Sequence, residues 1–173
     1  MNHFGRSRWP LFLITAVAGI VTAFLLAWAA AAVAQDVQEG QRIWADRAGC
    51  PNCHGWSGDG HISGFESPGG LPLRKTQLTR DQIRMTIQCG RPGTAMPHFD
   101  RLAYTDKRCY GMTAENLGNK VPDRAATTLQ PFQIDAVADY VAAKLKGAGP
   151  VTRAECAAYF DSTGAQCAKY PER

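Results

Sequence analysis

The sequence has no alternating run of apolar and polar residues long enough to form a β-sheet. It contains no HExxH, GxSxG or P-loop pattern, so the common hydrolase and nucleotide-binding sites are not indicated. Lys and Arg residues nowhere form a cluster interleaved with aromatic residues, which argues against a nucleic-acid partner. These absences leave a mainly helical chain whose chemistry depends on a few residues.

The first 34 residues have the composition of an export signal. Arg6 and Arg8 form a short positive leader, an apolar stretch covers residues 11–33, and Ala32-Val33-Ala34 is a small-x-small ending before Gln35. The alternative is an uncleaved membrane anchor, because the apolar stretch is nearly long enough to span a bilayer. In both cases we expect the remainder of the chain to be exported, and periplasmic.

The remainder, residues 35–173, is long enough for one domain and too short for two ordinary ones. Without Arg6 and Arg8 the basic residues number 17 against 15 acidic ones, a net charge of +2. The net charge of +4 for the whole chain therefore overstates how basic the exported part is.

Apolar spacing and end signals predict an all-α domain. Pro131 suits a first helical turn, and a continuous apolar stripe follows it up to Leu145. Thr79 is placed as the N-cap of a helix, and Thr152 with Glu155 forms a capping-box pattern. The helices that we expect cover residues 37–49, 79–88, 131–146 and 152–160.

One motif, Cys50-Pro51-Asn52-Cys53-His54, carries the chemistry. A thioredoxin-like dithiol would need a βαβ setting, and a zinc ribbon would need a second CxxC; the sequence shows neither. Covalent haem attachment fits the motif, because the two thiols can add to the two vinyl groups of one haem c and His54 then lies beside the iron as an axial ligand.

The sixth ligand of the iron is predicted to be Met96. It lies in Gly93-Thr94-Ala95-Met96-Pro97, where glycine and proline keep the backbone out of a helix and a loop can direct one side chain at a metal. Met85 is expected in the core and Met112 at the surface or lining the haem. The two remaining histidines of the exported part, His61 and His98, are expected to be solvated loop residues.

Four further cysteines remain, which allow three pairings. Proximity in the sequence favours Cys89 with Cys109 and Cys156 with Cys167. The first pair would enclose Met96, so we hypothesise that it staples the ligand loop. The second would pin a C-terminal extension, residues 147–173, to itself.

From Gly40 to Leu145 the chain resembles a class I cytochrome c. The resemblance rests on the stretches G…IW…AGCPNCHG, PGGLPLR, GRPGTAMPHF and IDAVADYVAAKL. It implies a fold of a few helices around one haem, with residues 35–146 as the haem domain. It also implies that Gly40 is the small residue where the first and last helices cross, against Tyr140. Pro68 would supply the carbonyl that accepts the His54 N–H, although Pro-Gly-Gly-Leu departs from the family's usual Gly-Pro-x-Leu.

A haem iron with histidine and methionine ligands has no free position for a substrate, which indicates one-electron transfer and not an enzyme. We expect redox proteins as partners: a dehydrogenase donor, in some systems a quinoprotein, and an oxidase or cytochrome acceptor. The alternatives are a membrane-anchored cytochrome subunit of a respiratory complex, and a five-coordinate haem enzyme or gas sensor if Met96 is not bound. A basic rim is a candidate docking surface, with a solvated face as the alternative; its members are Arg74, Lys75, Arg80, Arg84 and Arg91.

Overall fold

The computed structural model describes residues 36–61, 69–160 and 164–172. The expected leader or anchor within residues 1–34 and the candidate Pro68 lie outside the described residues. Within the described part, Asp36 onwards forms one compact unit, and its regular structure is helical, with two isolated β-bridges and no strand. The prediction of an all-α fold is confirmed. None of the helices in that part is both long and apolar enough to cross a membrane.

The first helix covers residues 36–42 and continues as η1 (Ile43–Arg47). α2 (Pro51–His54) and η2 (Leu73–Lys75) are short. α3 (Arg80–Cys89) begins at the expected N-cap, Thr79, whose side chain accepts from the backbone N–H of Gln82. α5 (Pro131–Tyr140) starts with the expected proline and continues as η4 (Val141–Leu145).

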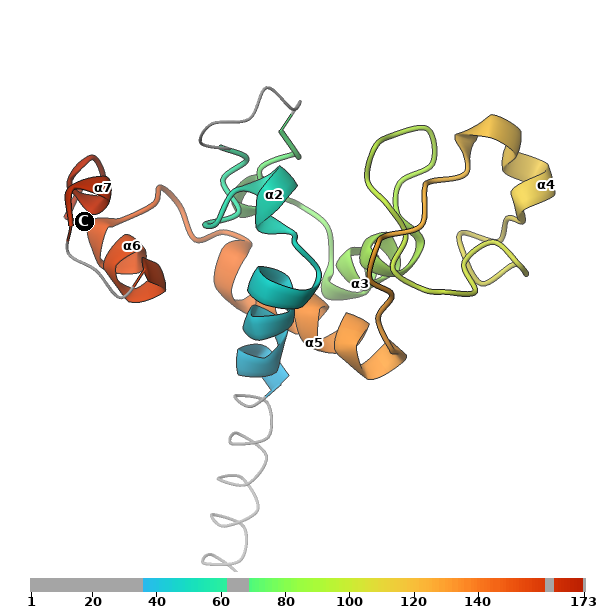
Figure 1. Ribbon diagram of the computed structural model, residues 1–173, viewed down its shortest axis with the longest axis horizontal. Coiled ribbons are helices and arrows are strands. Elements are labelled where there is room, and N and C mark those ends of the chain that lie inside the picture. The colour runs from blue at the N-terminus through green and yellow to red at the C-terminus, as the bar shows by residue number, and fades with distance from the viewer. Residues whose placement is uncertain (1–35, 62–68, 161–163, 173) are drawn as a thin grey trace, which may run out of the picture. The chain divides into compact units, whose positions relative to one another are not determined.

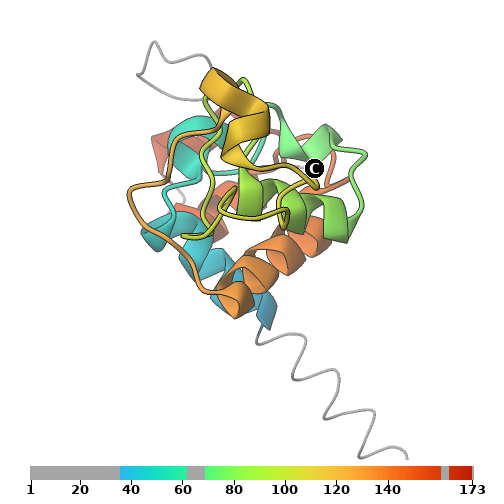
Figure 2. The ribbon, with the colours of Figure 1, turned by 90° about the vertical axis from the view of Figure 1, so that its right-hand side faces the viewer.

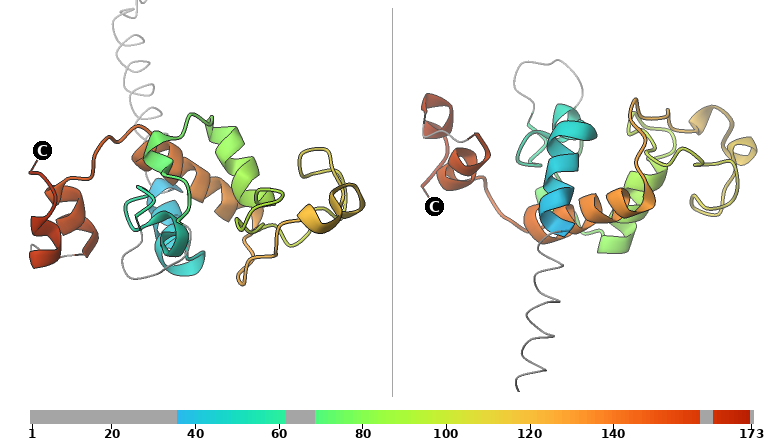
Figure 3. Two further views of the ribbon diagram at one scale, coloured as in Figure 1. Left: turned by 90° about the horizontal axis from the view of Figure 1, so that it is seen from above. Right: turned by 60° about the horizontal axis from the view of Figure 1, so that its bottom comes forward.

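α3 and α5 lie side by side in every view and contact each other more than any other pair of elements (Figures 1, 2 and 3). The first helix meets α5 at Gly40, whose missing Cβ would collide with the carbonyl oxygen of Ala136 and lie 2.8 Å from the Cβ atom of Tyr140. This confirms the expected crossing. Trp44, Ile134 and Val137 are almost completely buried at its centre.

Between α3 and α5 the chain forms a lobe, residues 90–125 (Figure 1), which joins the main core through Phe99. The lobe contains α4 (Ala114–Leu117) and η3 (Gly118–Lys120). It has its own small core around the buried Cys89–Cys109 disulfide, packed with Ala103 and Tyr104. The pairing that sequence proximity favoured is thus present.

The C-terminal extension contains α6 (Arg153–Phe160), which matches the expected helix, and α7 (Ala165–Ala168), which the sequence did not predict. The Cys156–Cys167 disulfide joins the two helices. The chain from Gly147 onwards is held to η2, because the backbone N–H of Gly147 donates to the Arg74 carbonyl at 3.0 Å.

Candidate haem site

α2 presents both thiols and the imidazole of the motif on a single helical turn. Cys50 is its N-cap and Pro51 fills the first position, where a missing N–H costs nothing. The turn closes through a hydrogen bond from the His54 N–H to the Cys50 carbonyl at 2.9 Å. Cys50 and Cys53 are free thiols, and Cys53 is exposed. They are therefore available for thioether bonds, while the other four cysteines are used in disulfides.

The imidazole of His54 is oriented by the main chain. Its Nδ1 atom lies 3.0 Å from the carbonyl oxygen of Leu71. Because a carbonyl only accepts, the proton of this bond is on Nδ1, which leaves the lone pair of Nε2 for a metal. Burial lowers the pKa of His54 below its ordinary value, and the Leu71 carbonyl opposes that shift more weakly. Both the tautomer and the neutral state suit an iron ligand.

The carbonyl that accepts from His54 belongs to Leu71, whereas the sequence analysis assigned this role to Pro68, outside the described residues. The family pattern Gly-Pro-x-Leu is matched in register by Gly70-Leu71-Pro72-Leu73, with leucine in the place of proline. The prediction followed the proline, but the conformation depends on the position after the glycine. The spacing of Gly70 and Leu73 was the signal that would have located it.

Gly70 allows this approach. A Cβ atom on Gly70 would lie 2.6 Å from both Nδ1 and Cε1 of His54. The Gly70 N–H also donates to the Cys53 carbonyl at 2.6 Å, which ties the strand-like segment before η2 directly to the motif. A glycine is needed here because the backbone passes against the imidazole edge.

Trp44 packs beside the motif, with its ring centroid 6.0 Å from that of His54. It is 2% exposed, and among the described residues its indole Nε1 finds no hydrogen-bond acceptor. A buried donor without a protein partner commonly marks the place of a further group. The site's donor set and this orphaned donor both fit a bound haem.

Met96 is half-buried, and it lies in a loop that is closed by hydrogen bonds within the loop. The Arg91 N–H donates to the Met96 carbonyl at 3.2 Å, and the Met96 N–H donates to the Thr94 hydroxyl at 3.2 Å. At the neck of the loop, Gly90 has φ +64°, and a Cβ atom there would lie 2.7 Å from the Met96 carbonyl oxygen. The expectation of irregular backbone is confirmed, and Met96 stands on a fixed loop.

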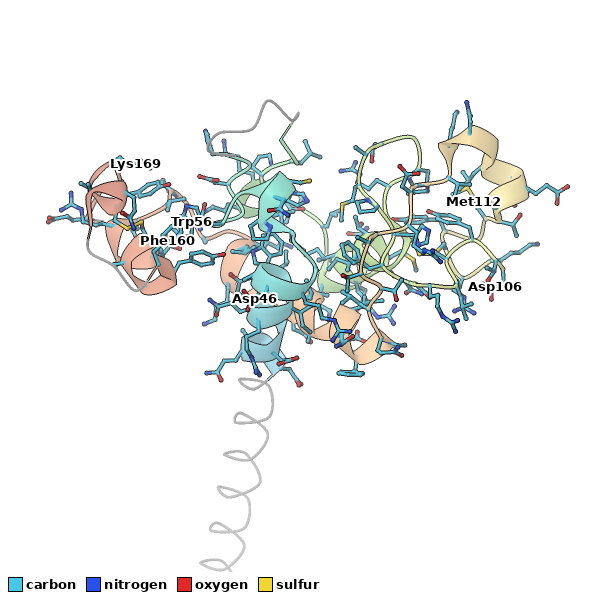
Figure 4. All side chains as sticks on the ribbon, in the orientation of Figure 1. Asp46, Trp56, Asp106, Met112, Phe160 and Lys169 are labelled. Atoms are coloured by element: carbon cyan, nitrogen blue, oxygen red, sulfur yellow. A yellow bond between two sulfur atoms is a disulfide. The ribbon has the colours of Figure 1, made fainter. Side chains whose placement is uncertain are left out.

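The rival ligand candidates were Met85, Met112, His61 and His98. Met85 packs in the core of the 90–125 lobe, 3.5 Å from the Cys89 sulfur, as expected. Met112 is half-buried on the outer part of that lobe (Figure 4). His61 is exposed, but the expectation for His98 is wrong: its side chain is 7% exposed. The His98 ring packs edge-on against Tyr104, with 6.2 Å between the ring centroids. Its Nδ1 atom lies 2.8 Å from the Asp100 carbonyl oxygen, so the ring is held inside the lobe.

The family described as Cytochrome C oxidase, cbb3-type, subunit III matches residues 35–114. The chain carries a c-type cytochrome domain. Such a domain binds haem c covalently and transfers electrons. No curated protein and no solved structure matches the chain.

The five members of the basic rim, which the sequence left open between a docking surface and a solvated face, differ in their surroundings. Arg74 is buried. Arg80 bonds to Asp135 and Asp139, and Arg84 also bonds to Asp135, so α5 neutralises both. Lys75 and Arg91 remain exposed. The paired arginines hold α3 against α5, a structural use that the sequence could not separate from docking.

Arg74 instead binds the C-terminal extension to the segment that follows His54. Its guanidinium donates to three carbonyls of residues 148–150, to the Ser57 carbonyl and to the Glu155 carboxylate. Trp56, two residues after His54, packs against Tyr159, Phe160 and Tyr170 with ring centroids 5.1 to 5.9 Å away. Figure 4 shows Trp56 and Phe160 meeting between the motif and the extension.

Proposed function

We propose that this chain is an exported one-electron carrier with a single haem c. In this proposal Cys50 and Cys53 form the thioethers, and His54 and Met96 are the axial ligands. The observation that carries it is the His54–Leu71 contact, which fixes the imidazole with Nε2 free. The bound haem supplies a reversible one-electron change of its iron.

The residues that hold the iron limit its chemistry to electron transfer. The Leu71 carbonyl holds the His54 ring and raises its basicity as a ligand. The closed loop of residues 90–97 holds the Met96 thioether, a soft ligand that favours ferrous iron. With both His54 and Met96 holding the iron, no position would be left for oxygen or a substrate, which would distinguish the carrier from a five-coordinate enzyme or gas sensor.

We further propose that residues 1–34 are an export signal, that residues 35–146 form the haem domain, and that residues 147–173 are an extension. The working partners are a periplasmic dehydrogenase donor and an oxidase or cytochrome acceptor. A second candidate is a cytochrome subunit within a respiratory oxidase. It is favoured by the description of the matching family, and it would retain residues 11–33 as an anchor.

Intact mass and spectra of the protein from its native host test the proposal. The expected mass is that of residues 35–173 plus one haem, and the expected ferric spectrum contains the weak far-red band of sulfur-to-iron charge transfer. Met96→Ala should abolish the band and allow carbon monoxide to bind, whereas Met112→Ala should leave both unchanged. A high-spin ferric spectrum of the unaltered protein would contradict the carrier. Recovery of the uncleaved chain with an oxidase would favour the subunit.

A further inference from the structure

Two tyrosines of the 90–125 lobe have an unusual backbone conformation. Tyr104 has φ +62° and Tyr110 has φ +55°, and they are the only non-glycine residues with positive φ in the part of the chain that the structure describes. The left-handed region costs an L-residue roughly 1–2 kcal/mol, so it persists where surrounding contacts require it. The two residues lie in the same part of the lobe and flank Cys109 in the sequence.

The side chains of these tyrosines converge on consecutive carbonyls. The Tyr104 hydroxyl donates to the Cys89 carbonyl at 2.7 Å, and the Tyr110 hydroxyl donates to the Gly90 carbonyl at 2.9 Å. Cys89 is the last residue of α3, and Gly90 is its C-cap. Tyr104 is 3% exposed, whereas Tyr110 is 40% exposed. Both hydroxyls therefore act at the point where α3 ends and the Met96 loop begins.

That point fixes the direction of the Met96 loop. Gly90 lies against the backbone of Met96, Pro97 and His98, with less than 3.0 Å between its Cβ position and each. On the far side, the Gly93 N–H donates to the Lys120 carbonyl and the His98 N–H donates to the Asp123 carbonyl, both at 2.9 Å. The loop is thus tied on one side to the segment around Lys120 and on the other to the two tyrosines.

We propose that Tyr104 and Tyr110 are positioning residues for the sixth iron ligand, acting through the carbonyls of Cys89 and Gly90 to hold the Met96 loop closed. This inference rests on the proposal that Met96 binds the iron. The Cys89–Cys109 disulfide links the segment that carries the two tyrosines to the end of α3. The two hydroxyls add hydrogen bonds to the carbonyls at the start of the Met96 loop. Burial raises the pKa of Tyr104 to about 12, so its hydroxyl remains a donor at all physiological pH values.

The test uses the full-length holoprotein with Tyr104→Phe, Tyr110→Phe and the double variant, with Tyr159→Phe in the extension as the matched control. Each hydroxyl contributes one hydrogen bond, so each loss should favour the open loop by about fivefold to tenfold. The far-red band should then be weaker, and the ferrous protein should bind carbon monoxide faster. The control should match the unaltered protein.

Global unfolding by denaturant is measured in parallel, because Tyr104 is buried and its variant loses some stability. If the far-red band and carbon monoxide binding of Tyr110→Phe and the double variant equal those of the unaltered protein, the tyrosines serve folding alone and the inference is overturned. If the unaltered protein lacks the band, the assignment of Met96 fails first. The two failures are therefore distinguishable.

Discussion

The backbone of Gly40 lies directly against the carbonyl oxygen of Ala136, where the first helix crosses α5. No side chain fits at that position, because a Cβ atom on residue 40 would also lie 2.8 Å from the Cβ atom of Tyr140. The contact joins two segments almost a hundred residues apart and buries Trp44 beneath them.

Gly40→Ala should therefore destabilise the protein, although alanine normally stabilises a helix relative to glycine by about 0.8–1 kcal/mol. The methyl group would force the helices apart, and such overpacking costs about 1–3 kcal/mol. Denaturant unfolding of the holoprotein measures the difference. Gln41→Ala, at the exposed neighbouring position, is the control and should change the free energy of unfolding by less than about 0.5 kcal/mol. Equal stability of the Gly40 variant would contradict the tight crossing.

Arg74→Met should loosen the extension from the cytochrome. The substitution removes a buried cation that donates to three carbonyls and to the Glu155 carboxylate, which then keeps its bonds from Thr152. Because Glu155 is 39% exposed, we expect a loss of about 2–3 kcal/mol, below the usual cost for a fully buried pair. Limited proteolysis should also cut the extension sooner.

The control for Arg74 is Arg42→Met, since Arg42 pairs with Glu39 on an exposed helix face. An exposed pair of this kind contributes about 0.5 kcal/mol or less. Comparable effects of the two variants would show that the Arg74 cluster does not hold the extension.

The two disulfides should separate stability from ligand retention. Their loops span 20 and 11 residues, so replacing either pair with alanine should lower the free energy of unfolding by about 3 kcal/mol. Only loss of Cys89–Cys109 should weaken the far-red band and admit carbon monoxide, because only that bridge lies in the lobe that holds Met96. The Cys156–Cys167 variant is thus the matched control, and an intact band in both variants would refute the staple.

Stability should fall at alkaline pH partly through Tyr104. Burial raises its pKa from 10.0 to about 12, so above pH 10 the unfolded chain loses a proton that the folded protein retains. The contribution is complete below pH 10 and is lost as the pH rises towards 12. In denaturant unfolding between pH 9 and pH 12, Tyr104→Phe should show a shallower decline than the unaltered protein. Parallel declines would mean that Tyr104 titrates normally.

Local patterns predicted the helices and the site motif well, because caps, apolar stripes and CxxCH are set by neighbouring residues. Thr79, Pro131 and Thr152 begin helices as expected. The use of Arg74 was missed, since its partners are distant in the sequence. The burial of His98 was missed although Asp100 and Tyr104 are near in the sequence, because an irregular turn brings them onto its ring. Solvation of a basic or imidazole side chain cannot be read without knowing what folds over it. The Leu71 carbonyl was missed because the prediction followed the proline of the family pattern, whereas any residue at that position supplies a main-chain carbonyl.

The use of a main-chain carbonyl to orient His54 affects which substitutions near the motif can be tolerated. The group that orients His54 belongs to the backbone, so the Leu71 side chain takes no part in the contact. Substitutions at Leu71 can change its side chain without removing the acceptor, as long as Gly70 is retained.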